Sequence, residues 1–178
     1  MYQTTPNQVF FIAGSATIGV QSSVASTSYT NLGAAQGIKI TEAWTLVEQE
    51  TLSMQPHYSP YKQEVILEVD LMEYDFLKLY TMRGGIDSYS TTSEKTFTSG
   101  GLSSMNSMAW QVVNTGPTSS QSITITIPYG HISEVFSIPF QSDDAAEVAK
   151  LHIVVRGVCQ TTATAGSMLY SIIDTRTT

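Results

Sequence analysis

Residues 64–83 read EVILEVDLMEYDFLKLYTMR, and this stretch holds the two periodicities that decide the fold. In its first half, every second residue from 65 to 71 is Val or Leu. Side chains two positions apart on a strand point to the same face. This half therefore predicts a β-strand with one face in a core. The opposite face carries three carboxylates, those of Glu64, Glu68 and Asp70.

The second half of the stretch predicts a helix over residues 73–83. Glu73 and Asp75 stand in its expected first turn and Arg83 in its last, where each charge complements the helix dipole. Gly84 follows at the position that favours a left-handed C-terminal cap. The apolar side chains expected to hold this helix against a sheet are Phe76, Leu77, Tyr80 and Met82.

Outward from this stretch, period-two alternation recurs along the chain. The further candidate strands are residues 9–13, 38–46, 108–114, 123–127, 131–140, 151–159 and 168–174. About eight strands at fairly regular spacing are typical of a sandwich or a barrel. We therefore predict an all-β fold with one short helix, in which two antiparallel sheets pack together.

The length of 178 residues fits one domain. Two stretches read as long loops: residues 49–61, which contain Pro56 and Pro60, and residues 84–107, which are rich in Gly, Ser and Thr. Residues 29–37 read as a turn region before a strand, and residues 143–148 as a short helical turn. Such long loops inside a compact domain are usually functional or disordered.

The charge balance excludes several functions. The net charge is −7, with 8 Lys plus Arg against 15 Asp plus Glu, so no basic stripe is available for ordinary DNA or RNA binding. Only 13% of residues are charged, and such a neutral surface is typical of proteins that present large faces to one another. No Lys or Arg precedes Lys39, and no apolar stretch has membrane-helix length, so we expect neither a signal peptide nor a membrane span.

The sequence shows no convincing catalytic or metal site. His57, His131 and His152 are far apart, and no metal-ligand spacing accompanies them. Cys159 is the only cysteine, and its apolar run predicts a small buried side chain. Trp110 stands among apolar neighbours and is expected to be buried, as is Trp44. We expect no enzyme activity, no cofactor and no metal.

Three stretches in their order along the chain resemble the major tail tube protein of tailed viruses of bacteria and archaea. They are LGAAQGIKI (residues 32–40), VILEVDLMEYDFLKL (65–79) and ITIPYGHI (125–132), and the resemblance spans roughly residues 9–174. It implies two packed β-sheets with a flanking helix. It also implies that six copies form a ring whose inner strands line a channel, and that stacked rings form the tube through which viral DNA passes.

The resemblance implies a partner set and a location as well. The partners are copies of the same chain, with tape-measure, sheath and tail-end proteins, and double-stranded DNA only in transit. The location is the tail of the virion, after synthesis in the host cytoplasm. Open sheet edges tend to pair with other strands, so we expect the folded unit to leave backbone groups at its rim that sister subunits complete.

The same resemblance suggests roles for particular residues. Glu64, Glu68 and Asp70 are candidates for an acidic channel wall, although a solvent-exposed outer face remains an alternative. Residues 1–20 are the candidate N-terminal arm, and residues 175–178 a candidate C-terminal arm. The candidate loop toward a neighbouring ring is 49–61, with residues 84–107 competing for that role. Its named residues are Pro56, Tyr58, Pro60 and Tyr61.

Two alternatives stay open. One is another β-sandwich part of a virion, such as a decoration or tail-end protein. The other is a carbohydrate-binding β-sandwich, in which exposed tryptophans and tyrosines stack on sugars. The expected burial of Trp44 and Trp110 argues against the second alternative.

Overall fold

A computed structural model describes residues 16–21, 28–49, 57–73, 75–84, 88–90, 95–98, 107–116, 121–133, 150–159 and 169–175. These residues form a mainly β structure with one short helix, as predicted. The elements are β1 (Ala16–Gln21), β2 (Tyr29–Gln49), β3 (His57–Leu71), α1 (Phe76–Met82), β4 (Ser88–Ser90), β5 (Thr96–Thr98), β6 (Met108–Thr115), β7 (Ser122–Ile132), β8 (Leu151–Val158) and β9 (Ser171–Asp174).

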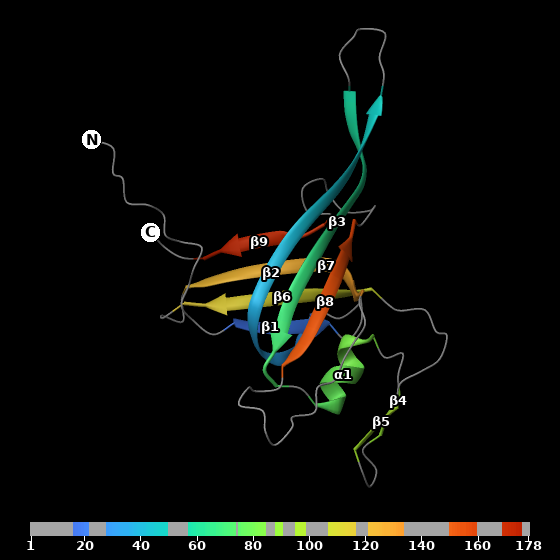
Figure 1. The fold of residues 1–178 in the computed structure, drawn as a ribbon. Helices are drawn as coiled ribbons and strands as arrows, with labels where there is room; N and C mark the ends of the chain where they lie inside the picture. The colour runs from blue at the N-terminus through green and yellow to red at the C-terminus, as the bar shows by residue number, and fades with distance from the viewer. Residues whose placement is uncertain are drawn as a thin grey trace, which may run out of the picture.

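Six antiparallel strands close into a barrel. Their order is β6-β1-β2-β3-β8-β7, and pairing between β6 and β7 completes the ring, while β9 adds to β7. In Figure 1, β2, β3 and β8 form a front layer that crosses the layer of β1, β6, β7 and β9 at a steep angle. This is the orthogonal form of a two-sheet sandwich, so the predicted fold class is confirmed.

The core lies between these two layers and follows the predicted alternation. Val65, Leu67, Val69 and Leu71 of β3 are all buried, and Trp110 is the largest fully buried side chain. The Trp110 indole N–H donates to the carbonyl of Gly130 at 3.1 Å, which satisfies its one polar group. The core is therefore apolar throughout the described residues, with no buried polar or charged residue among them.

Strand β2 is longer than predicted, because the turn expected at residues 29–37 is part of it. The Asn31 side chain accepts from the N–H of Gly33 at 2.8 Å, and Gly33 and Gly37 have φ angles of 123° and 62°. The pairing with β3 shifts register between Gln36 and Lys39. The glycines and Asn31 thus mark irregularities within a continuous strand, which they resemble locally more than a chain reversal.

The loop expected at residues 49–61 is shorter than predicted. Gln49 ends β2, and β3 begins at His57, so Tyr58, Pro60 and Tyr61 are strand residues. Pro60 pairs opposite Leu46, next to a register shift between Thr45 and Leu46. Proline is tolerated in strands at such bulges. The two strands form a long hairpin that projects from one end of the barrel (Figure 1).

Helix α1 spans Phe76–Met82, which is shorter than the predicted 73–83. Asp75 is its N-cap, with a side-chain oxygen 2.7 Å from the Lys78 N–H that it accepts from, and Arg83 is its C-cap. Neither charge therefore lies within the first or last turn, because capping places these side chains just outside the helix. Gly84 has a φ of 72°, which confirms the left-handed residue after the helix.

The helix buries a different face from the one predicted. Leu79 and Met82 are buried, whereas Phe76 and Leu77 are exposed. Phe76 stacks on Phe97 of β5, with ring centroids 6.2 Å apart. Strands β4 and β5 pair into a small hairpin beside α1, so the stretch 84–107 is not a single loop. No helix of the described residues is long and apolar enough to cross a membrane.

Other boundaries also change. Residues 16–20 belong to β1 inside the barrel, so an N-terminal arm through residue 20 is too long. The strand expected at 131–140 has its first two residues at the end of β7, and β9 is shorter than the predicted 168–174. The expectations for residues 9–13, 143–148 and 176–178, and for Pro56, lie outside the described residues.

Candidate functional site: a charge-paired strand face and an unpaired strand edge

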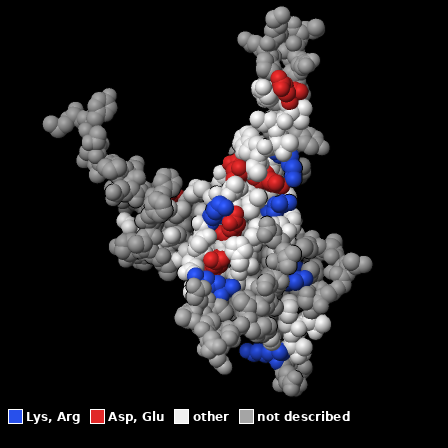
Figure 2. Space-filling model, in the orientation of Figure 1, with Lys and Arg blue, Asp and Glu red and all other residues white. Residues whose placement is uncertain are grey.

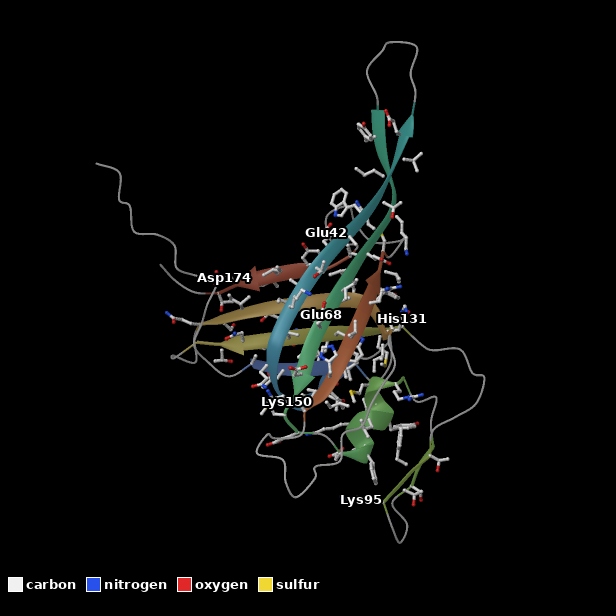
Figure 3. All side chains as sticks on the ribbon, in the orientation of Figure 1. Glu42, Glu68, Lys95, His131, Lys150 and Asp174 are labelled. Carbon is white, nitrogen blue, oxygen red and sulfur yellow. The ribbon has the colours of Figure 1, made fainter. Side chains whose placement is uncertain are left out.

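The outward face of the front layer carries the carboxylates singled out in the sequence. Glu64, Glu68 and Asp70 lie on the face of β3 opposite its buried residues, and the same face continues over β2 and β8. We call this surface the charged strand face. Its cationic side chains come from all three strands: Lys39 of β2, Lys62 of β3 and Arg156 of β8 (Figures 2 and 3).

Each of the three carboxylates has a basic partner. Lys39 Nζ lies 2.8 Å from Glu68 Oε1, and Lys62 Nζ lies 2.9 Å from Glu64 Oε2. Arg156 Nε lies 3.8 Å from the same Glu64 oxygen. His152 Nδ1 lies 2.7 Å from Asp70 Oδ1, across the β3–β8 pair. The face therefore carries matched opposite charges, which the expectation of a purely acidic wall did not include.

The environment of Glu64 shows how these pairs act. Hydrogen bonding to the Lys62 ammonium lowers the pKa of Glu64, and the charges of Arg156 and Lys62 lower it further, while partial burial opposes them. Glu64 is also the least exposed of the three carboxylates, since 16% of its side chain is accessible. It is the centre of the tightest charge cluster on this face.

The front layer has one long strand edge without a partner. β1 pairs with β2 from Tyr29 to Ala35, and β3 pairs with the opposite edge of β2 from Ala35 to Gln49. Within the described part of the chain, no strand pairs with the β1-side edge of residues 36–49. Barrel closure removes the other long edges, so the expected open rim is concentrated on this half of β2.

The projecting hairpin carries apolar side chains into solvent. Trp44 is exposed, contrary to prediction, although it alternates with Ile38 and Ile40, which pack against the core. Beyond them, β2 leaves the end of the barrel, and nothing among the described residues covers Trp44, Leu46 or Tyr58. Period two identifies a strand face, but it does not show where that face passes the end of a core.

Nothing in the described segments indicates catalysis or metal binding. No group of three or more potential metal ligands is found among them. Cys159 is exposed at the end of β8, so its predicted burial is wrong. The basic partners Lys39, Lys62, Arg156 and His152 were missed, and only the strand register, which pairs residues distant in sequence, could have identified them.

The arrangement defines a class of protein: a small orthogonal β-barrel with a projecting hairpin, a flanking helix and an unpaired strand edge. No family model matches the chain, and no curated protein matches it in sequence.

Solved structures match it over most of its length. One is a chain of the anti-feeding prophage cap, the tube terminating cap, at TM-score 0.50 and 9% identity, covering 88% of this chain and 87% of that one. Another is a chain of the sheath-tube complex of an extracellular contractile injection system (PVC), in its extended state. It has TM-score 0.52 and 9% identity, with coverage of 88% and 94%. The chain thus has a tail-tube-like fold.

Proposed function

We propose that this chain is a structural subunit that assembles with copies of itself into rings, most simply of six copies, and that the rings stack into a tube. The support is the tail-tube-like fold together with the unpaired half of β2. The tube belongs to a phage tail or a related particle, and the subunit has no catalytic role. Tape-measure, sheath and tail-end proteins are its further proposed partners.

The observation that carries this proposal is the edge of residues 36–49. An exposed strand edge presents N–H and C=O groups that readily pair with another strand, and natural proteins usually cover or disrupt such an edge. Here the edge runs along a hairpin that already protrudes from the barrel. Pairing with a neighbouring copy would complete these groups and extend the front layer from one subunit to the next.

In this arrangement the charged strand face lines the channel. Its paired charges suit a conduit, because a wall with no excess of Lys or Arg does not hold a polyanion by its phosphates. Glu64, Glu68 and Asp70 then belong to the channel wall, together with their basic partners. Double-stranded DNA in transit is the cargo that we propose for it.

One alternative gains an observation from the structure. Trp44 and Tyr58 are exposed on the hairpin, so the argument from burial no longer counts against a carbohydrate-binding surface. A glycan array distinguishes the two functions, since a sugar-dependent signal lost in Trp44→Ala would favour carbohydrate binding. Another β-sandwich part of a virion remains the second alternative.

Electron microscopy and sedimentation velocity of the purified protein test the proposal together. We expect rings or hollow tubes in the micrographs and a concentration-dependent series of oligomers in solution. A strictly monomeric protein at every concentration, with no ring in any field, would contradict it.

A further inference from the structure

We propose that the tip of the hairpin of one subunit docks on the helix end of another, so that this contact stacks subunits along the tube. The inference rests on the proposed function, since it assigns the surfaces that join successive rings. Two apolar patches carry it. The hairpin patch consists of Trp44, Leu46 and Tyr58 with Glu48, and the helix patch consists of Phe76, Leu77 and Phe97 with Lys78 and Lys95.

The hairpin patch is a continuation of the core-facing side of the sheet. Trp44, Leu46 and Glu48 alternate along β2, and Tyr58 pairs opposite Glu48 on β3. Trp44, Leu46 and Tyr58 are 55%, 52% and 54% exposed. Contiguous apolar surface on a soluble face usually marks an interaction site, and this patch lies where the barrel no longer covers it.

The helix patch is the second exposed apolar surface of comparable make-up. Phe76 and Leu77 are 39% and 48% exposed at the start of α1, and Phe76 stacks on Phe97 of the small β4–β5 hairpin. The helix therefore buries Leu79 and Met82 against the barrel and leaves these aromatic and aliphatic groups to solvent.

The two patches lie at opposite ends of the molecule. Figure 1 shows the β2–β3 hairpin projecting from one end and α1 with β4 and β5 at the other. A subunit cannot bring its own patches together, so each needs a partner. Joining two different patches of the same chain makes a head-to-tail contact, which repeats into rings or filaments instead of ending in a dimer.

Charge selects the helix patch over the other exposed apolar surface, at Ile172 and Ile173 of β9. Glu48 places a carboxylate within the hairpin patch. The helix end has Lys78, Arg83 and Lys95 against Glu73 and Asp75, whereas β9 ends at Asp174. Figure 3 shows Lys95 at the extremity opposite the hairpin. An acidic patch meets a mildly basic one at the helix end and a carboxylate at β9, so the helix end is the better electrostatic match.

Surface substitutions test the contact without touching the core. Leu46→Gln and Leu77→Gln should each raise the protein concentration needed for tubes at least tenfold while leaving the ring intact. Ile173→Gln is the matched control, because Ile173 is 54% exposed and lies outside both patches. Tubes that form normally from Leu77→Gln protein overturn the inference and leave the ring proposal standing. Loss of tubes with Ile173→Gln as well would also count against it, since the effect would not be specific.

Disulfide trapping tests the contact directly. In a Cys159→Ser background, protein carrying both Leu46→Cys and Leu77→Cys should oxidise into a ladder of covalent multimers. Each single-cysteine variant should stay monomeric on the gel, and an equimolar mixture of the two should stop at dimers. Tubes that form without a ladder refute this docking. A protein that forms no assembly of any kind, in the Cys159→Ser background or the wild type, refutes the proposed function itself.

Discussion

The phenol of Tyr170 donates a hydrogen bond to Glu42 Oε2 at 3.0 Å, and this contact ties the approach to β9 to the middle of β2. The two residues are 128 positions apart in the sequence. The bond connects the back layer of the barrel to the strand whose other edge is unpaired. It therefore braces the part of β2 that we propose as the subunit interface.

Tyr170→Phe should remove this brace at a small cost. The bond is exposed, so we expect a loss on the order of 0.5 kcal/mol in the free energy of unfolding, measured by urea denaturation. A second readout comes from pH. The hydrogen bond to Glu42, burial and the Glu42 charge raise the pKa of Tyr170 above 10.0. Its stabilising effect is present below the unfolded value and is lost as pH rises through the folded pKa. The wild-type advantage should therefore disappear in alkaline buffer, and an advantage that persists there would contradict the assignment.

Gly157→Ala should destabilise the barrel itself. A Cβ at residue 157 would lie 2.5 Å from Val65 Cγ1 and 2.6 Å from Ile127 Cγ2, inside a closed core. Overpacking of this kind costs roughly 1–3 kcal/mol, which thermal denaturation will detect. Gly116→Ala is the control, because the contacts there involve Gln121 near the end of β7, at 3.2 Å or more. Equal effects of the two substitutions would mean that the β7–β8 crossing is not tightly packed.

Proline substitutions at Thr41 and Glu42 should separate the two edges of β2. Successive N–H groups on a strand point to opposite edges, so one proline removes a donor to β3 and the other removes a donor from the unpaired edge. We expect one variant to lose stability. The other should keep a melting temperature close to that of the wild type and yet form no rings, because proline is tolerated on an open edge. Rings from both variants would rule out this edge as the interface.

Acid should weaken the charge cluster around Glu64. Because its pKa is lowered in the folded state, its stabilising effect is present above the ordinary value of 4.5 and is lost as pH falls through the folded pKa. Glu64→Gln should therefore be less stable than the wild type at pH 7, and the difference should shrink in acid. Denaturation curves at several pH values measure this, and a pH-independent difference would mean that packing, not charge, is responsible.

Removing the carboxylates of the charged strand face should reverse its behaviour toward DNA. The triple variant Glu64→Gln, Glu68→Gln, Asp70→Asn leaves Lys39, Lys62 and Arg156 without counter-charges. We expect this variant to bind double-stranded DNA in a salt-sensitive way and the wild type not to bind.

The control for this experiment changes net charge equally but off the face, with Glu42→Gln, Glu48→Gln and Glu73→Gln together. DNA binding by both variants would show that total charge, and not the paired face, governs the interaction. The micrographs give a further result: a triple variant that still forms tubes is expected if the face lines the channel, whereas lost assembly would place it in an interface.

The sequence by itself determined the fold class and most strand positions. Period-two alternation over residues 64–71 predicted β3 with the correct core face, since every buried residue there is Val or Leu. The capping pattern around Asp75 and Gly84 located the helix to within a few residues. These features depend on local backbone geometry, which neighbouring residues specify directly.

Only the tertiary structure decided which surfaces are exposed and which charges are paired. Trp44 has the same alternation as Ile40, but its exposure follows from where β2 passes the end of the barrel. The pairing of Asp70 with His152 spans 82 residues and depends on the register between β3 and β8. Register and closure arise from the packing of the whole barrel, so no local pattern of residues encodes them.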